Sequence, residues 1–190
     1  MTSSVEQLIE FATAVANALE ACGSSYYVAH GLTDLLLGQS AVQGNLVLVA
    51  ALQPEQAEQL VSRLSRFHIE PADVVQSAAG DLGGFGIVHP QHHQIAEVWR
   101  HPADEFSCAK MARRQSCEIG GLSLWLCSPE DAILDKLILE QGGRSGQRWT
   151  GLLEILRTQA AGLDYTYLGE WAARLGVSPV LSWALIEAEI

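Results

Sequence analysis

The sequence predicts an α+β chain, in which a mixed β-sheet flanked by helices is followed by a C-terminal helical segment. Up to about residue 127, short apolar runs bounded by glycine or polar turns alternate with helical repeats. From residue 128 onward only short amphipathic helical repeats remain. We therefore expect an αβ portion at residues 1–127 and a helical portion at 128–190, packed as one compact body.

The first half of the chain supplies the central strands of the predicted sheet. Helical spacing of apolar residues predicts a helix over 4–22, and Gly23 ends it. A strand at 25–29, the His30-Gly31 turn, a short helix at 32–37 and a second strand at 45–52 follow. The second strand is almost wholly apolar, as a strand covered on both faces should be.

The remaining elements follow from turn residues and helix caps. We expect a helix from Pro54 to about residue 66, then extended segments within 67–77 and a turn at 79–84. Paired strands are predicted at 85–89 and 94–99. An irregular stretch then leads to residue 115, and a hairpin follows at 116–119 and 122–127. Ser128 and Pro129 begin the next helix as cap and first-turn residue, and Asp131 can complete a capping box. Helices are predicted at 128–140, 147–159, 165–175 and 179–188.

Composition narrows the class of protein. The chain of 190 residues is 48% hydrophobic and 17% charged, which is typical of a globular protein with a sizeable core. Its net charge of −11 argues against an extended nucleic-acid surface, although a local basic patch can still hold one nucleotide. An apolar run of the roughly 18–20 residues that a membrane span needs is absent, as is a basic N-terminal leader. We expect a cytoplasmic protein whose four cysteines are free, buried thiols.

The order of elements, together with SPEDAILDKLILEQ at 128–141 and LLEILRTQAAGLDYTYLGEWAARLGV at 152–177, resembles a known family. It is similar to the bacterial nucleotidyltransferase-fold proteins described as minimal nucleotidyltransferases or as the toxin half of abortive-infection systems. The resemblance covers nearly the whole chain after the first helix and implies a nucleotidyltransferase-like sheet.

In that family a glycine turn ends the first strand, an Asp-x-Asp pair begins the central strand, and a later strand adds a third carboxylate. Side chains two residues apart on a strand share a face, so the carboxylates can chelate Mg²⁺ on a nucleoside triphosphate. Glycine in the turn allows backbone N–H groups to approach phosphate.

The resemblance places these roles on particular residues of this chain. The turn falls on His30 and Gly31, the acid pair on Asn45 and Val47, and the third carboxylate on Glu97. An amide still coordinates weakly through its carbonyl oxygen, whereas valine does not coordinate. One carboxylate makes a poor Mg²⁺ site, which leaves Glu97 as a weak metal ligand and implies no resident cofactor.

Several charged residues have two interpretations each. Lys110, Arg113 and Arg114 form a basic cluster that would hold a triphosphate or an acidic partner, or would simply be solvated. Lys136 would face a nucleotide cleft or, more simply, lie on the surface. Asp34 would approach the phosphates or be an ordinary acid on a helix surface.

Two other residue types suggest chemistry with simpler alternatives. The histidines at 89, 92, 93 and 101 together with Glu97 suggest a zinc site, or a solvated hairpin tip. The five tryptophans do not follow base-stacking spacing, so core packing is the better interpretation.

Three functions follow. The first is a non-catalytic binding or interaction module with a decayed Mg²⁺ site, in a toxin–antitoxin or defence setting, whose partner is a protein or a nucleotide. The second is an active nucleotidyltransferase that moves a nucleoside monophosphate from Mg²⁺–NTP to a protein or RNA hydroxyl, with Glu97, Asn45 and Asp34 at the metal. The third is a structural subunit whose apolar helices at 175–185 form a homodimer.

Overall fold

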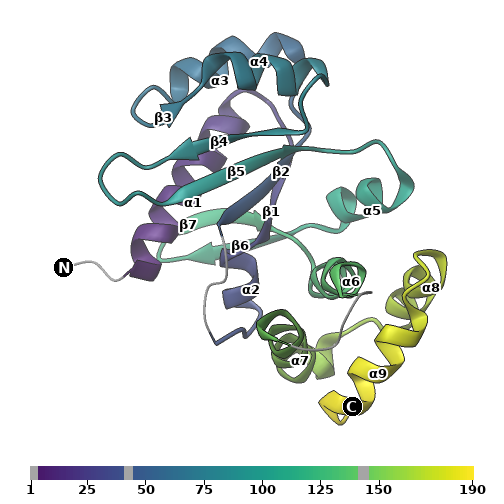
Figure 1. Cartoon of the computed structure of the whole chain (residues 1–190). Coiled ribbons are helices and arrows are strands. Elements are labelled where there is room, and N and C mark those ends of the chain that lie inside the picture. Colours follow the sequence, from purple (N-terminus) through teal and green to yellow (C-terminus); the bar gives the residue numbers. More distant parts are fainter. Residues whose placement is uncertain (1–3, 41–44, 141–145) are drawn as a thin grey trace. The chain divides into compact units, whose positions relative to one another are not determined.

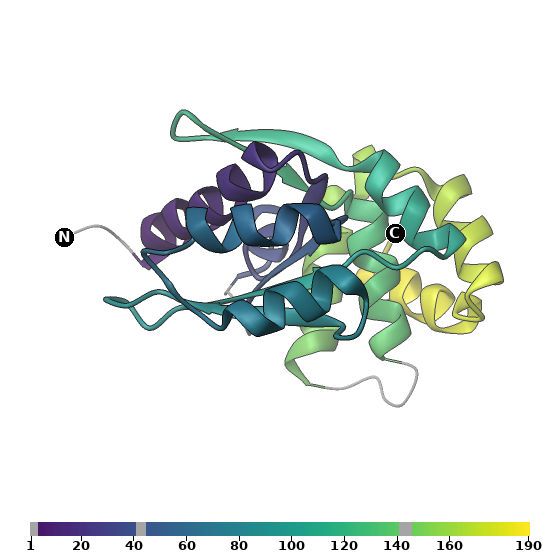
Figure 2. The ribbon, with the colours of Figure 1, turned by 90° about the horizontal axis from the view of Figure 1, so that it is seen from above.

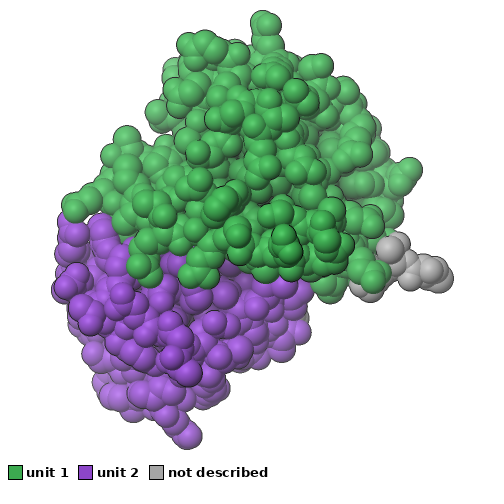
Figure 3. Space-filling model, turned by 180° about the vertical axis from the view of Figure 1, so that it is seen from behind, with its two compact units in different colours: residues 1–32, 44–126 green, residues 33–43, 127–190 purple. Residues whose placement is uncertain are grey.

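The computed structural model of the chain describes residues 4–40, 45–140 and 146–190. The chain divides into two compact units, coloured in Figure 3. Unit 1 comprises Met1–Leu32 and Gly44–Leu126, and unit 2 comprises Thr33–Gln43 and Cys127–Ile190. The sequence interpretation placed residues 33–40 in the αβ portion with the rest of 1–127, whereas their contacts group them with the helical unit.

Unit 1 is built on a mixed β-sheet of seven strands within the described residues, in the order β3-β4-β5-β2-β1-β7-β6 (Figure 1). The strands are β1 (Tyr26–His30), β2 (Leu46–Ala50), β3 (His68–Ile69), β4 (Gly84–Val88), β5 (Ile95–Arg100), β6 (Gln115–Ile119) and β7 (Leu122–Leu126). The β2–β5 and β1–β7 pairs are parallel and the other pairs are antiparallel. The predicted mixed sheet is confirmed.

The helices of unit 1 are α1 (Ser4–Ala21), the 3₁₀ turn η1 (Pro54–Gln56), α3 (Ala57–Arg63), α4 (Pro71–Ala79) and α5 (Glu105–Arg113). Helix α1 contacts β1, β2 and β7, and α4 contacts β4 and β5, with α3 between α1 and α4 (Figure 2). Leu46 and Leu48 of β2 and Val98 of β5 are buried in the core with these helices. Because strand side chains alternate, Val47 and Glu97 lie on the opposite face of the sheet.

Two helices of unit 1 were not predicted. Only His68–Ile69 of the expected extended stretch is strand, and Pro71 then begins α4, which ends at Gly80 with φ of +94°. Helix α5 begins at Asp104, whose carboxylate accepts the Ser107 backbone N–H at 2.9 Å. Both helices carry local start signals, proline in one and an acidic cap in the other.

Unit 2 is helical, as predicted. It contains most of α2 (Leu32–Leu36) together with α6 (Pro129–Leu139), α7 (Gln147–Gln159), the 3₁₀ turn η2 (Ala160–Gly162), α8 (Tyr165–Arg174) and α9 (Ser178–Ala188). Helix α7 packs on α6 and α9, and α8 packs on the same two helices. Within the described ranges, none of the helices has the length and apolar character needed to cross a membrane.

The Ser-Pro-Glu-Asp start of α6 links it to α8. The Ser128 hydroxyl accepts the Asp131 N–H at 3.2 Å and donates to the Asp131 carboxylate at 2.7 Å, so the predicted cap forms through the hydroxyl. The other Asp131 oxygen accepts the Tyr167 hydroxyl at 2.7 Å, and Glu130 accepts the Asp164 N–H at 2.9 Å. Both acids are buried and hold the start of α8, which explains why this motif is acidic.

Candidate functional site

The β2–β5 pair brings together the residues that were predicted to form the metal site. The two strands run parallel, and Val47 lies directly beside Glu97 in the register. Asn45 lies one residue before β2, on the same face as Val47 because the two are separated by two positions. Asn45, Val47 and Glu97 therefore form one cluster, on the sheet face opposite α1.

Neutral donors occupy both oxygens of the Glu97 carboxylate. The Asn45 amide nitrogen Nδ2 donates to Oε1 at 2.7 Å. The Trp99 indole Nε1 donates to Oε2 at 3.0 Å. Trp99 was not predicted as a site residue, although its position two residues after Glu97 on the same strand was a readable signal.

The glycine turn lies against the start of β2. His30 of β1 pairs with Val47 after an irregularity in the register, and Gly31 follows with φ of +75°. A Cβ added at Gly31 would lie 2.8 Å from the Asn45 carbonyl oxygen. Glycine is thus required at this position both by the backbone conformation and by the close approach of the two chain segments.

The donor set at this cluster does not fit Mg²⁺. The ion needs near-octahedral oxygen coordination, and proteins supply it through one or two carboxylates with substrate phosphates and water, whereas here Glu97 is the single acid and Val47 offers no oxygen. Within the described residues there is no group of three histidine, cysteine, aspartate or glutamate side chains that could hold a metal. The histidine-rich hairpin presents no such group, which favours the solvated hairpin tip over the zinc site.

The basic cluster does not act as one group. The Lys110 ammonium lies 4.7 Å from the Phe106 ring centroid, and the Arg114 guanidinium lies 4.7 Å from that of Trp125. Arg114 also lines a hollow of about 340 Å³ with Glu20 and Tyr26. A phosphate-binding role for this cluster stays a prediction.

In unit 2, Asp34 and Lys136 form a buried ion pair. Their charged atoms are 3.0 Å apart, and their side chains are 4% and 10% exposed. The expectation of a surface aspartate on α2 and a surface lysine on α6 is wrong, because each charge is covered by the packing of the helices of unit 2. Burying two charges is costly unless they are paired, so each residue depends on the other.

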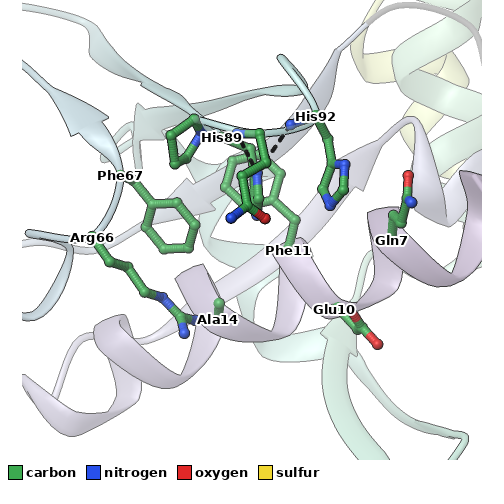
Figure 4. A pocket seen from close by; sticks show the side chains of 10 residues that line it. Gln7, Glu10, Phe11, Ala14, Arg66, Phe67, His89 and His92 are labelled. Atoms are coloured by element: carbon green, nitrogen blue, oxygen red, sulfur yellow. Dashed lines mark hydrogen bonds between the residues drawn. The ribbon is translucent and has the colours of Figure 1, made fainter. Parts of the chain in front are cut away.

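An aromatic cluster of unit 1 lines a hollow of about 350 Å³ next to α1 (Figure 4). The ring centroids of Phe11 and Phe67 are 5.2 Å apart, those of Phe67 and His89 are 5.6 Å apart, and His92 stacks on His89 at 4.6 Å. Arg66 lies over the Phe67 ring. Burial, followed by the charges of His92 and Arg66, lowers the pKa of His89 below its ordinary range.

Comparison with known proteins identifies the architecture. No protein-family model and no curated protein matches the sequence. Among solved structures, an antigenic nucleotidyltransferase-like protein from Paracoccidioides brasiliensis superposes with a TM-score of 0.56 at 19% identity, over 95% of this chain and 92% of that one. The antibiotic-resistance factor ANT(2'')-Ia superposes with a TM-score of 0.53 at 12% identity, over 97% of each chain.

The chain has a nucleotidyltransferase-like fold. The α+β architecture expected from the sequence, with its mixed sheet and C-terminal helices, is confirmed. At these identities the likeness establishes the fold alone.

The structure corrects the predicted burial of two tryptophans and one cysteine. Trp149 and Trp171 are buried, as core packing requires, whereas Trp99 is 49% exposed and Trp183 is 53% exposed. The four cysteines are free, and among them Cys108 is exposed rather than buried.

Proposed function

We propose that this protein is a nucleotidyltransferase-fold module whose Mg²⁺ site has decayed, and that it acts by binding a partner rather than by catalysis. The observation that carries the proposal is the surroundings of the Glu97 carboxylate. Its two oxygens accept hydrogen bonds from Asn45 and Trp99, and its neighbour in the register is Val47.

This arrangement opposes metal binding in two ways. The Asn45 amide presents its N–H₂ group to Glu97, so it would have to give up a hydrogen bond to a charged group, worth about 1.5–3 kcal/mol, before its oxygen could bind a cation held by Glu97. The cation would also lack a second carboxylate, because Val47 stands where the family places one. The remaining ligand is the side-chain oxygen of Asn45, which is a weak one for a hard cation.

The proposal also includes a biological setting for the protein. The resemblance to minimal nucleotidyltransferases and abortive-infection toxins supports a toxin–antitoxin or defence role, in which a protein partner is the natural ligand of a module without catalysis. The two structural neighbours are described as an antigenic protein and as an antibiotic-resistance factor, and these descriptions concern those proteins.

Active nucleotidyl transfer is the alternative, and one observation favours it. Asn45 and Glu97 remain side by side near the Gly31 turn, so two oxygen-bearing side chains and the phosphate-turn glycine are retained. In this case the chain would move a nucleoside monophosphate from Mg²⁺–NTP to a protein or RNA hydroxyl.

Calorimetric titration with ATP, CTP, GTP and UTP, each with Mg²⁺, separates the two functions. The proposal expects no metal-dependent binding of any nucleotide. Metal-dependent binding that Glu97→Ala abolishes would establish the alternative. The double variant Asn45→Asp/Val47→Asp serves as the positive control, because it restores the carboxylates and should gain affinity for Mg²⁺ or Mn²⁺.

A further inference from the structure

We propose that Trp99 and Glu97 form a recognition site for an arginine side chain, presented by a basic segment of a protein partner. This inference rests on the proposed non-catalytic function, because a metal at Glu97 would exclude a cationic side chain. It names the chemistry of the partner that such a module would bind.

The Trp99 indole is fixed on one side and open on the other. A Cβ added at Gly83 would lie 3.3 Å from Cζ3 of Trp99, and one at Gly84 would lie 3.3 Å from its Cδ2. The ring therefore rests on glycine backbone, which a side chain at either position would prevent. Its N–H is held by Glu97 at 3.0 Å, and 49% of the residue remains exposed.

The sheet next to Glu97 lacks side chains on this face. Gly84 pairs with Trp99 and Gly86 pairs with Glu97, so both glycines share the face of their partners. A Cβ at Gly86 would meet nothing within 4 Å. Ile95, which is 40% exposed, lies two residues before Glu97 on the same face. The result is a strip of bare backbone on β4 beside a row formed by isoleucine, glutamate and tryptophan on β5.

Arginine fits this combination better than other cationic or planar groups. Its guanidinium is flat and stacks on an aromatic face while donating in its own plane to a carboxylate. Each Glu97 oxygen accepts one hydrogen bond from Asn45 or Trp99 and keeps lone-pair capacity for another. The isoleucine offers apolar surface to the methylene stem of the arginine.

Charge complementarity decides the kind of partner. The protein carries a net charge of −11, and the proposed site adds a carboxylate whose hydrogen-bonded neighbours are neutral. A phosphate-bearing ligand would be repelled at this point, whereas a basic peptide would be attracted. Lysine is the weaker alternative because its ammonium is a point charge that does not stack.

The test is calorimetric titration of the full chain with a blocked Gly-Arg-Gly-Arg-Gly peptide and its lysine counterpart at low ionic strength. We expect the arginine peptide to bind several-fold more tightly than the lysine peptide, and added salt to weaken both. Glu97→Gln and Trp99→Leu should each lower the affinity about tenfold, and Trp99→Phe should lower it less. Trp183→Leu, at the other highly exposed tryptophan, should leave the affinity unchanged, and circular dichroism verifies that every variant is folded.

Three outcomes would overturn the inference. The first is absence of binding at millimolar peptide, and the second is equal binding of the two peptides with no effect of Trp99→Leu, which would indicate surface charge alone. The third is Trp99-dependent binding of an uncharged nucleoside in place of the peptide, which would make this a site for stacking a nucleobase.

Titration with Mg²⁺–NTP distinguishes failure of the arginine site from failure of the proposed function. Glu97-dependent nucleotide binding refutes the proposed function, whereas failure of both peptide and nucleotide to bind refutes only the arginine site.

Discussion

The Asn45 amide donates a 2.7 Å hydrogen bond to the Glu97 carboxylate across the parallel β2–β5 pair. In an active site of the family's kind, a carboxylate at this position would repel Glu97 until a cation was bound. The amide replaces that repulsion with an attraction, so the two side chains stabilise each other without a metal.

The first prediction concerns Asn45→Asp. Two carboxylates in contact repel each other, so we expect the free energy of unfolding at pH 7 to fall by about 1–3 kcal/mol. Stability should recover toward pH 5, because the repulsion raises the pKa of one carboxyl group and a proton can be shared. Urea unfolding at the two pH values measures this, and Asn45→Ala, which removes the hydrogen bond without adding charge, is the control. A pH-independent loss would mean that charge repulsion is not the cause.

The second prediction concerns the buried pair of Asp34 and Lys136. Lys136→Met leaves a buried carboxylate without its cation, and breaking such a pair costs about 3–5 kcal/mol. Adding Asp34→Asn to this variant removes the remaining charge and should restore part of the lost stability. Chemical denaturation of the two single variants and the double variant gives the coupling, with Lys110→Met as the comparison for loss of a lysine elsewhere. Additive effects of the two substitutions would argue against the pairing.

The third prediction separates two reasons for glycine at position 31. Gly31 and Gly176 have nearly the same φ, +75° and +73°, but a Cβ at Gly176 would meet nothing within 4 Å. Gly176→Ala therefore carries only the backbone cost, about 1–2 kcal/mol. Gly31→Ala adds the clash with the Asn45 carbonyl and should be clearly more destabilising in thermal unfolding. Equal losses would show that the close approach at Asn45 relaxes freely.

The fourth prediction concerns pH and His89. Its Nδ1 accepts the backbone N–H groups of Gln91 and His92, both at 3.3 Å, so the folded protein favours the neutral ring. Because its pKa is lowered in the folded state, the unfolded chain takes up the proton first as pH falls. Stability should therefore decline from about pH 7 through the ordinary value of 6.5 and level off below the lowered pKa.

The matched variants for this effect are His89→Asn and His68→Asn. Asparagine at 89 keeps an acceptor for the turn but does not titrate, so the decline below pH 7 should become shallower even if the variant is less stable overall. Facing His89 are His92, Arg66 and, on α1, Glu10, and none of these is altered by the change. His68 is exposed on β3, and its replacement should leave the slope as it is. An unchanged slope in His89→Asn would assign the pH response to other groups.

Local signals in the sequence were enough to predict most of the elements. The caps of α6, the glycine breaks and the apolar runs of β1 and β2 act over a few residues, so they can be read without the fold. Helices α4 and α5 were missed although Pro71 and Asp104 mark their starts, because both are short and their start signals were not weighed. The resemblance also led to the cluster of Asn45, Val47 and Glu97, which the strand register then placed side by side.

By itself, the sequence determined most of the helices and strands and the local cap at Ser128, because caps, periodicity and turns are interactions between near neighbours in the chain. The long-range partners of polar side chains were decided by the tertiary structure alone. Asp34 and Lys136 are far apart in sequence, and only packing within the helical unit turned two expected surface charges into a buried pair. Likewise, the Trp99 ring is exposed and hydrogen-bonded to Glu97, because the strand pairing places glycines rather than bulky side chains beside it. Burial and hydrogen bonding depend on what covers a residue, and that is a property of the assembled sheet and helices.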